Sequence, residues 1–179
     1  METLQNVLTR RSAIRLASPA PSDEELLRLV AAAMTAPDHG RLLPWHLLTL
    51  RGVAREKLGQ TYASCAGRDV NLRRRAAAKP LRAPLLIAIV FSPVEHPKIP
   101  EWEQLAATVA AVHTLALLLH DRGYGCIWRT GEVLEDEGVR SLHEVKPGER
   151  LLGWLYTGTA IDTPPSRPSP DAQSRLRAL

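Results

Sequence analysis

The sequence predicts one domain in which α-helices are layered on a β-sheet. Three observations support this fold class: predicted strands alternate with predicted helices, residues 85–92 form a nearly continuous apolar run, and residues 100–122 form a long apolar helix. An apolar run of that length is typical of a strand that is covered on both faces. A chain of 179 residues is long enough for one compact domain and too short for two ordinary ones.

The N-terminal part of the chain predicts two helices. Apolar residues at helical spacing favour a short amphipathic helix over residues 2–10. Ser22 is followed three residues later by Glu25, which is the pattern of a capping box and marks the start of a second helix. Pro37 ends that helix, because the residue before a proline disfavours helical backbone angles.

The middle of the chain predicts two strands with two helices between them. The strands span residues 46–51 and 85–92, and the helical candidates span about 53–66 and 69–79. The second strand contains almost only aliphatic residues, so we expect it at the centre of the sheet.

The longest predicted helix spans residues 100–122. Pro100 stands near its first turn and Gly123 marks its end. Residues 105–119 are apolar nearly all round, which predicts burial on every side. Such a helix belongs at the centre of a fold or in a dimer interface. We therefore expect His113, within this stretch, to be a hydrogen-bonded core residue.

The C-terminal part predicts strands over residues 125–130 and 151–158, with a short helix near 135–143 between them. Prolines then dominate the sequence, which is typical of an extended arm or a disordered segment. We therefore divide the chain into a domain of residues 1–160 and a Pro-rich tail of residues 161–179.

The formal net charge of +4 suggests that the protein binds phosphate groups somewhere. The densest basic run, 73–75, favours a solvated helix face or loop, and no long basic block or recognition element indicates nucleic-acid binding. Cys65 and Cys126 fit no metal spacing. They can form a disulfide, but we expect two buried thiols in a reducing cytosol. The first 12 residues lack a signal-peptide pattern, and no uncharged apolar stretch reaches ~20 residues. We expect a cytoplasmic protein with no membrane partner.

Two candidate binding clusters lie at element ends and carry Arg side chains. Arg10, Arg11 and Ser12 follow the first helix, and two guanidiniums with a hydroxyl can grip a phosphate. The alternative is that these cations complement the dipole of their own helix. Trp128-Arg129-Thr130-Gly131 ends a predicted strand, where Arg and Thr donors can meet an anion or a polar ring edge. The alternative is an Arg that only serves solubility.

Two further clusters contain His or Trp residues. His39 follows a predicted turn at residues 36–38 and can reach a ligand or another subunit, although the segment can also be a plain turn. Trp45 offers a flat apolar surface for a ring or an anchor for the core. The chain contains no Walker loop, complete Rossmann fingerprint, HExxH or GxSxG motif, and its His residues form no metal spacing. We therefore expect no metal site and no catalytic nucleophile.

The order of these clusters resembles the nitroreductase family. The resemblance covers about residues 1–160, and its five motifs lie in register. They are Leu8-Thr9-Arg10-Arg11-Ser12-Ala13-Ile14-Arg15, Ala33-Met34-Thr35-Ala36-Pro37-Asp38-His39 with Pro44-Trp45-His46, Pro100-Glu101-Trp102-Glu103-Gln104, Gly125-Cys126-Ile127-Trp128-Arg129-Thr130-Gly131 and Gly153-Trp154-Leu155-Tyr156-Thr157-Gly158-Thr159.

This resemblance implies an α+β fold of the nitroreductase type, with a mostly antiparallel or mixed sheet, flanking helices and a long buried central helix. It also implies a homodimer with FMN at the subunit interface. The implied cofactor residues are Arg10, Arg11 and Ser12 for the phosphate and ribityl region, Trp128, Arg129 and Thr130 from the same chain, and Thr35 and His39 from the partner subunit. Two positions depart from the family: Leu43 replaces a common Gln, and Thr35 stands where close relatives have Arg.

The implied activity is an oxidoreductase in which NADH or NADPH reduces the flavin and the flavin reduces an acceptor such as a nitroaromatic compound or a quinone. One site used in turn by both substrates gives ping-pong kinetics. The alternative is a flavin-binding protein of the same fold with little turnover or with different flavin chemistry.

Overall fold

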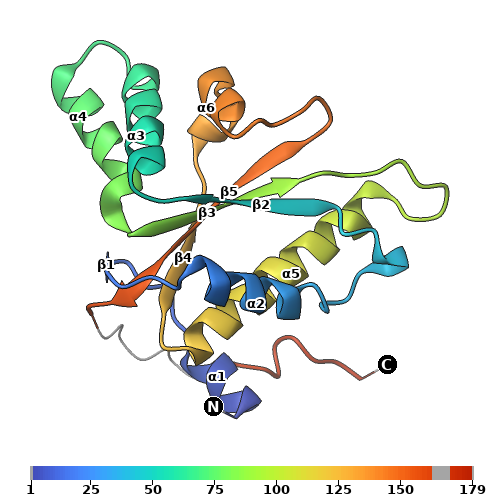
Figure 1. Ribbon diagram of the computed structural model, residues 1–179. Helices are drawn as coiled ribbons and strands as arrows, with labels where there is room; N and C mark the ends of the chain where they lie inside the picture. Colours follow the sequence, from blue (N-terminus) through green and yellow to red (C-terminus); the bar gives the residue numbers. More distant parts are fainter. Residues whose placement is uncertain (1, 163–169, 179) are drawn as a thin grey trace.

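The computed structural model describes residues 2–162 and 170–178. Within these residues a five-stranded sheet carries helices on both faces, with α3, α4 and α6 on one side and α1, α2 and α5 on the other (Figure 1). The elements are α1 (Thr3–Thr9), β1 (Leu16–Ala17), α2 (Asp23–Ala33), η1 (His39–Arg41), β2 (Trp45–Leu50), α3 (Val53–Cys65), α4 (Val70–Ala78), η2 (Lys79–Arg82), β3 (Leu85–Phe91), α5 (Glu101–Asp121), β4 (Gly125–Arg129), η3 (Glu132–Glu135), α6 (Glu137–Leu142) and β5 (Arg150–Ala160).

All strand pairs in the described sheet are antiparallel. β3 lies between β2 and β5, and β5 also pairs with β4 and with the short β1. The expected α+β class with a mostly antiparallel sheet is therefore confirmed. Although strands and helices alternate along the chain, the paired strands do not run parallel. The reason lies in the two helices between β2 and β3. α3 and α4 pack on each other as a hairpin, so the chain returns to the end of the sheet that it left and enters β3 in the opposite direction.

The sheet separates two apolar cores, and β3 supplies both. Every residue of β3 is buried, as its apolar run predicts. Alternate side chains point to opposite faces. Leu86, Ala88 and Val90 pack with Tyr62 and other residues beneath α3, α4 and α6. Leu85 and Ile87 pack with residues of α2 and α5 on the other face.

Helix α5 is not buried on every side within one chain. Its buried face includes Ala107, Ala111, Leu115 and Leu119, but a stripe at helical spacing remains exposed. The members of this stripe are Trp102, Ala106, Val109 and His113. The expectation that His113 is a core residue is therefore wrong: it lies on the exposed stripe. The described residues leave this largely apolar face uncovered.

Among the described helices, α5 is the one whose length and composition would allow it to cross a membrane. It packs on α2, on β3 and on β4 in this fold. A core helix of a layered protein has the same composition, and packing accounts for the buried face of α5.

Helix α2 begins with half of the predicted capping box. The Ser22 hydroxyl accepts a hydrogen bond from the Glu25 backbone N–H at 3.1 Å. The Glu25 carboxylate does not return to Ser22; it accepts a 2.8 Å hydrogen bond from the Tyr124 hydroxyl beside β4. This hydrogen bond connects the N-terminal turn of α2 to the short segment between α5 and β4.

The two cysteines differ in exposure. Cys126 is buried on β4, as expected, but the expectation for Cys65 is wrong because this residue is exposed at the end of α3. Helical spacing predicted α3 correctly but did not predict which face the α4 hairpin would cover.

The Pro-rich tail is described only in part. Pro164, Pro165 and Pro168, on which the prediction of an extended or disordered arm depends, lie outside the described residues. Residues 170–178 contain no helix or strand and are exposed.

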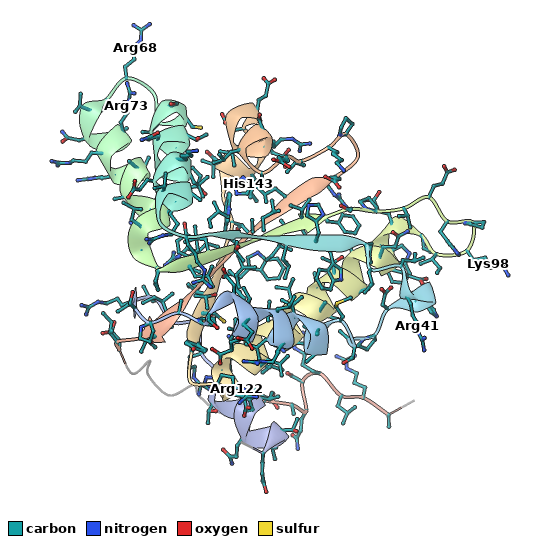
Figure 2. The ribbon with its side chains drawn as sticks, viewed as in Figure 1. Arg41, Arg68, Arg73, Lys98, Arg122 and His143 are labelled. Atoms are coloured by element: carbon teal, nitrogen blue, oxygen red, sulfur yellow. The ribbon has the colours of Figure 1, made fainter. Side chains whose placement is uncertain are left out.

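Side chains at the tip of the α3–α4 hairpin point away from the body of the protein (Figure 2). Arg68 and Arg73 are the labelled examples, and both are exposed. The basic run at residues 73–75 is thus a solvated helix face, in agreement with the sequence interpretation.

Candidate cofactor site

The segment that carries Arg10, Arg11 and Ser12 is fixed against β4. Ser12 forms a parallel bridge with Cys126, and the Ala13 backbone N–H donates to the Cys126 carbonyl at 3.1 Å. The preceding helix α1 is anchored on α5. There, the Asn6 amide donates to the Leu117 carbonyl at 3.0 Å, and the Thr9 hydroxyl lies 3.0 Å from Nε2 of His120. Helix α1 has no buried residue, so these polar contacts position the segment.

A cavity of about 280 Å³ lies between this segment, β4 and α5. Its lining includes Arg10 and Ser12 from the N-terminal segment, Trp128 from β4, and Val109 and His113 from the exposed stripe of α5. No hydrogen bond or ion pair of the Arg10 guanidinium is found among the described residues. A free guanidinium beside a hydroxyl is a suitable arrangement for an anion.

Arg11 points elsewhere. Its guanidinium donates to the Leu8 carbonyl at 2.6 Å and to the Arg10 carbonyl at 3.0 Å, which are orphan acceptors at the C-terminus of α1. For this residue the alternative reading, a cation that complements its own helix, describes the observed contact. The structure therefore brings Arg10 and Ser12 together and leaves Arg11 outside the cavity lining.

The outer edge of β4 is covered only at its beginning. Since the Cys126 carbonyl points outward to Ala13, the alternation of an antiparallel ladder turns the peptide group of Trp128 outward as well. No described residue pairs with it there. The Trp128 indole N–H donates to the Leu152 carbonyl at 2.9 Å, so the ring is held in place and presents its surface rather than its donor.

A bulge in β5 makes room for this arrangement. The register of β3 against β5 shifts next to Leu152, and Gly153 has a φ of 116°. A Cβ atom at Gly153 would lie 2.4 Å from the Arg129 carbonyl oxygen and 2.9 Å from the Trp128 indole nitrogen. Only glycine fits here without displacing the Trp128 ring or the strand.

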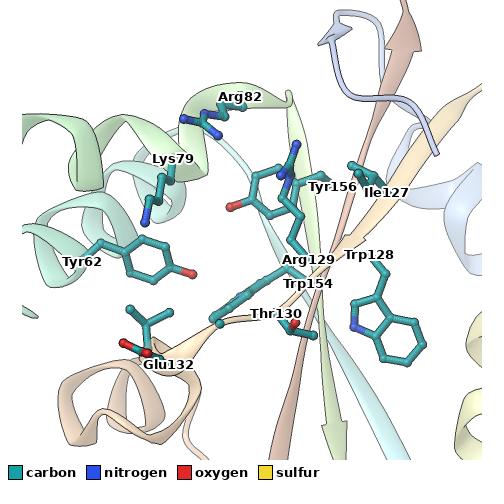
Figure 3. Close-up of a pocket in the computed structure, with 12 residues that line it drawn as sticks. Tyr62, Lys79, Arg82, Ile127, Trp128, Arg129, Thr130, Glu132, Trp154 and Tyr156 are labelled. Carbon is teal, nitrogen blue, oxygen red and sulfur yellow. The ribbon is translucent and has the colours of Figure 1, made fainter. Parts of the chain in front are cut away.

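Arg129 points to the opposite face of the sheet from the Arg10 cavity. Its guanidinium lies over the Tyr156 ring, with the guanidinium carbon 5.5 Å from the ring centroid. Its Nε atom is buried and has no hydrogen-bond partner among the described residues. Arg129 and Thr130 line a second cavity of about 470 Å³, drawn in Figure 3. The two cavities share Ile127 and Trp128, so they flank the same strand edge.

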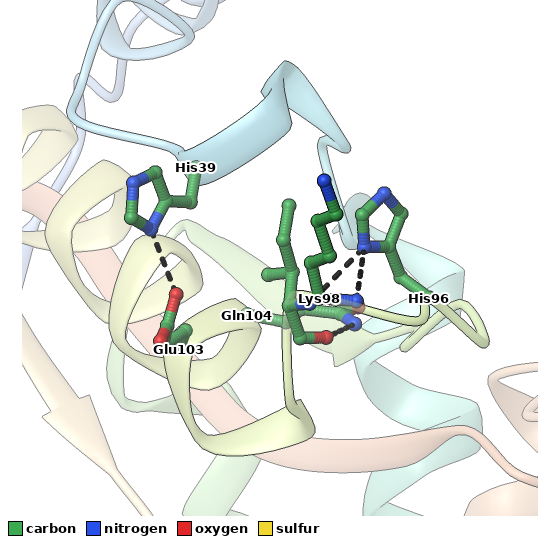
Figure 4. A network of polar contacts seen from close by, with 6 residues as sticks. His39, His96, Lys98, Glu103 and Gln104 are labelled. Atoms are coloured by element: carbon green, nitrogen blue, oxygen red, sulfur yellow. Dashed lines mark hydrogen bonds and ion pairs between the residues drawn. The ribbon is translucent and has the colours of Figure 1, made fainter.

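Thr35 and His39 lie apart from both cavities. The Thr35 hydroxyl donates to the Ala32 carbonyl at the end of α2. Nδ1 of His39 lies 2.7 Å from the Glu103 carboxylate on α5 (Figure 4). His39 lines a shallow cavity of about 580 Å³ together with Trp102 on the exposed stripe of α5. A single chain therefore does not bring these two residues to Arg10.

The departure at Leu43 has a local consequence. Its backbone has a φ of 46°, and its N–H donates to the Asp38 carboxylate at 2.7 Å. The Leu43 side chain is partly exposed and offers no polar contact where the family commonly has Gln. Trp45, the ring-surface candidate of this segment, is half buried at the start of β2 and lines neither of the two cavities beside β4.

Two titratable groups near the Arg10 cavity have pKa values shifted toward the uncharged form. Burial raises the pKa of the Cys126 thiol to about 11, so this residue of the cavity lining is no nucleophile at neutral pH. Burial, and then the Arg10 guanidinium, lower the pKa of His120. Among the described residues, no cluster of His, Cys, Asp or Glu could hold a metal ion.

Sequence reasoning missed several residues of the second cavity. Tyr62 comes from α3, Lys79 and Arg82 from η2, and Tyr156 from β5. The pair of cations directly before the apolar strand was the one available signal. The aromatic residues gave none, because only the α3–α4 hairpin brings Tyr62 over β5.

Comparison with known proteins gives a consistent result. The sequence model of the nitroreductase family matches residues 7–159. The chain belongs to the nitroreductase family. It is 37% identical over 162 residues to the protein named "Putative NAD(P)H nitroreductase YdjA" of Escherichia coli (strain K12), covering 89% of this chain and 88% of the relative. It is 30% identical to the "Putative NAD(P)H nitroreductase" of Haemophilus influenzae, covering 90% of each.

Solved structures agree on the fold. A nitroreductase-like family protein from Bacillus cereus superposes with a TM-score of 0.86 at 22% identity, covering 100% of this chain and 96% of the other. The FMN and NADPH-dependent nitroreductase NfnB from sphigopyxis sp. strain HMH superposes with a TM-score of 0.76 at 17% identity, covering 100% and 99%. The expectation of an enzyme of the nitroreductase family, a flavin-dependent oxidoreductase, is thereby confirmed at the level of the family.

The residues beside β4 fit a flavin phosphate cofactor of this family. The free guanidinium of Arg10, the Ser12 hydroxyl and the unpartnered Nε of Arg129 are donors for an anion or a polar ring edge. The outward peptide of Trp128 and the held indole ring offer a polar strand edge next to a flat apolar surface. The cavity around Arg10 is small for a whole nucleotide.

Proposed function

We propose that this nitroreductase-family chain is an FMN-dependent oxidoreductase that uses NADH or NADPH to reduce an acceptor such as a nitroaromatic compound or a quinone. The observation that carries this proposal is the Arg10–Ser12 pair beside the open edge of β4 at Trp128. We place the enzyme in the cytoplasm. Its folded domain is residues 1–160, and the tail of residues 161–179 is assigned no site.

When bound, FMN would accept hydride from the nicotinamide and pass reducing equivalents to the acceptor. Arg10 and Ser12 would hold the phosphate and ribityl region. Arg11 would contribute through its contacts with the C-terminus of α1. The Trp128 peptide and the Arg129 guanidinium would donate toward the polar ring edge, and Thr130 would add a further contact. Donors at that edge stabilise negative charge as it develops.

The chain contributes no nucleophile and no obligatory acid–base pair to this scheme. The Cys126 thiol remains protonated at neutral pH because burial raises its pKa. The remaining contribution of the protein is to position the cofactor and the substrates. One site, used first by the nicotinamide and then by the acceptor, gives ping-pong kinetics.

The proposed enzyme is a homodimer with FMN at the subunit interface. The exposed stripe of α5 supports this arrangement, because two of its large apolar side chains are exposed to solvent in one chain. Trp102 is 69% exposed and Val109 is 42% exposed. Thr35 and His39 would then approach the flavin from the partner subunit. His39 is itself exposed and held by Glu103 on α5, next to that stripe.

An absorbance spectrum of the purified protein, taken before and after anaerobic addition of NADPH or NADH, tests the proposal. Flavin bands that bleach on addition of the nucleotide are the expected result. Bands that persist with either nucleotide would favour the alternative, a flavin-binding protein with little turnover. Absence of bands after reconstitution with FMN would overturn the proposal.

A further inference from the structure

The positive charge of this protein is concentrated in one hairpin. Six of the 23 Lys and Arg residues lie between residues 66 and 82, against one of the 19 Asp and Glu residues. This segment therefore carries a charge of +5, and the remainder of the chain carries −1. Its one carboxylate, Asp69, is engaged in capping α4, where it accepts from two backbone N–H groups.

The tip of this hairpin presents arginines and apolar side chains together. Arg68 and the arginines at 73–75 are exposed, and none of them forms an ion pair with a described residue. Between them, Val70 is 77% exposed and Leu72 is 52% exposed. Exposed apolar side chains that stand among cations on a helix are typical of a surface that binds at a membrane interface.

The packing of α4 on α3 holds this surface away from the rest of the fold. A Cβ atom at Gly59 of α3 would lie 2.5 Å from the Ala77 carbonyl oxygen of α4, so the two helices are in close contact. Helix α4 buries Ala76 and leaves residues 70–75 exposed. The tip projects from the body of the protein in Figure 2, so this surface is convex. A flat and deformable partner can meet it directly.

Helix α3 separates these arginines from acidic side chains. The elements η3 and α6 carry Glu132, Glu135 and Glu137, all of them exposed. Helix α3 packs on α4 and on α6, and it lies between them in Figure 1. The positive surface is therefore on the side of α3 away from these carboxylates, which orients the molecule toward an anionic surface.

The hairpin is also separate from the proposed cofactor site. Helices α4 and α5 pack on opposite faces of the sheet (Figure 1). The Arg10 cavity and the exposed stripe of α5 both lie on the α5 side. A partner at the tip of the hairpin would therefore compete neither with FMN at Arg10 nor with the proposed dimer.

We propose that the tip of the α3–α4 hairpin docks on the surface of a bilayer that contains anionic phospholipids. Arg68 and the arginines at 73–75 would contact the headgroup phosphates, while Val70 and Leu72 would enter the boundary with the acyl chains. The apolar pair favours a bilayer over nucleic acid, because a phosphate backbone offers it no comparable contact. Residues 66–82 also contain no aromatic side chain that could stack on a base.

This contact is peripheral and reversible. The expectation of no membrane partner was based on the lack of a spanning segment, and the hairpin provides a different kind of contact. It is compatible with the proposed cytoplasmic location, since the cytoplasmic leaflet carries a negative surface potential. The inference goes beyond the proposed oxidoreductase function and does not depend on it.

Flotation of the full-length protein with vesicles tests the inference. Vesicles of phosphatidylcholine alone are compared with vesicles that also contain phosphatidylglycerol, at an ionic strength of about 0.15 M. We expect binding to the anionic vesicles only, and weaker binding as the salt concentration rises. Binding to neither kind of vesicle, or equal binding to both, would overturn the inference.

Combined substitution of Arg73→Gln, Arg74→Gln and Arg75→Gln should lower the affinity for anionic vesicles by about a hundredfold. Each cation near an anionic surface contributes about fivefold. Glutamine forms helices about as readily as arginine, so α4 is retained. Thermal unfolding of the variant checks that the loss does not come from unfolding.

The matched control combines Arg28→Gln, Arg122→Gln and Arg175→Gln. It lowers the net charge from +4 to +1 like the first variant, but at exposed positions outside the hairpin. Figure 2 shows Arg122 at the opposite end of the molecule. The affinity of this control should stay within about twofold of the wild type, since salt screens distant charges. An equal loss in both variants would show an effect of bulk charge and would overturn the docking surface.

The double variant Val70→Ser and Leu72→Ser tests the choice of a bilayer as the partner. It keeps every charge, so we expect the affinity for anionic vesicles to fall by about fivefold through the lost apolar insertion. An unchanged affinity would overturn the bilayer as the partner. So would tighter binding of the wild type to a short DNA duplex than to anionic lipid at equal phosphate concentration.

Discussion

The indole N–H of Trp154 donates a 2.9 Å hydrogen bond to Nε2 of His143. Both residues are almost completely buried, and Nδ1 of His143 lies 2.7 Å from the Val139 carbonyl. Because Nε2 accepts, Nδ1 must carry the proton and donate to Val139, so the imidazole is neutral and its tautomer is fixed. This contact joins β5 to α6 beneath the second cavity.

The buried neutral His143 predicts a pH-dependent stability. Burial lowers its pKa in the folded protein, so its contribution to stability is fully present above the ordinary value of about 6.5 and is lost as the pH falls from there toward the lowered pKa. The loss should not exceed about 1.4 kcal/mol per pH unit. Chemical denaturation between pH 8 and pH 5 measures it, and His143→Gln, which keeps a donor and an acceptor, should flatten the curve over this range. An equally steep curve for the variant would assign the effect to other groups.

Gln104 predicts a second stability effect. Its amide accepts from the Val94 N–H at 3.0 Å and donates to the Val94 and Ile99 carbonyls at 2.8 and 3.1 Å, which fixes the loop before α5 (Figure 4). Gln104→Leu would leave these backbone groups without their partner, so we expect a loss of about 2–4 kcal/mol in the free energy of unfolding.

The control for this prediction is Gln60→Leu, an exposed position on α3 where the same substitution should change stability by less than about 0.5 kcal/mol. Urea denaturation compares the two variants. Similar stabilities would contradict the role assigned to the Gln104 amide.

The different orientations of Arg10 and Arg11 predict different effects on cofactor affinity. Arg10→Gln should raise the Kd for FMN by about tenfold or more, because the Arg10 guanidinium is free in the cavity. Arg11→Gln should raise the Kd less, because the Arg11 guanidinium bonds the carbonyls of Leu8 and Arg10. Quenching of FMN fluorescence by the apoprotein measures both values. A larger effect at Arg11 would mean that its side chain turns toward the phosphate when FMN binds.

The exposed stripe of α5 predicts how the proposed dimer can be separated. Ala106→Glu places a charge in the middle of the stripe, and burial of an unpaired carboxylate in an interface is costly. We expect a monomer in light-scattering measurements, together with a large loss of bound FMN. Val70→Glu, at a residue of α4 that is 77% exposed, should leave the oligomeric state unchanged. A wild-type monomer that binds FMN fully would contradict the interface.

The sequence was most informative where one interaction decides the local structure. The apolar run at β3 and the Ser22 cap of α2 were predicted correctly because burial and capping act over a few residues. The antiparallel direction of the sheet was not predictable from alternation, since it depends on α3 and α4 packing as a hairpin. The exposure of His113 and of Cys65 depends on which helix faces other segments cover.

The candidate site was likewise predictable only in its local features. The family motifs at residues 8–15, 125–131 and 153–159 identified segments that lie at β4. They did not distinguish Arg10, which lines the cavity, from Arg11, which caps its own helix. Lys79 and Tyr62 escaped notice because they reach the second cavity from elements distant in sequence. The roles of all eight proposed cofactor residues remain predictions, as does the division at residue 160.

The concentration of cations between residues 66 and 82 changes how the isoelectric point of this protein should be interpreted. A value near 9.4 describes a basic protein, yet without this hairpin the chain would be slightly acidic. Binding to a cation exchanger would therefore depend on which face of the molecule meets the resin. A few charge-reversing substitutions on α4 would make the net charge negative, so that the protein would bind an anion exchanger instead. Bulk charge in this protein is a property of one protruding element, not of the enzyme body.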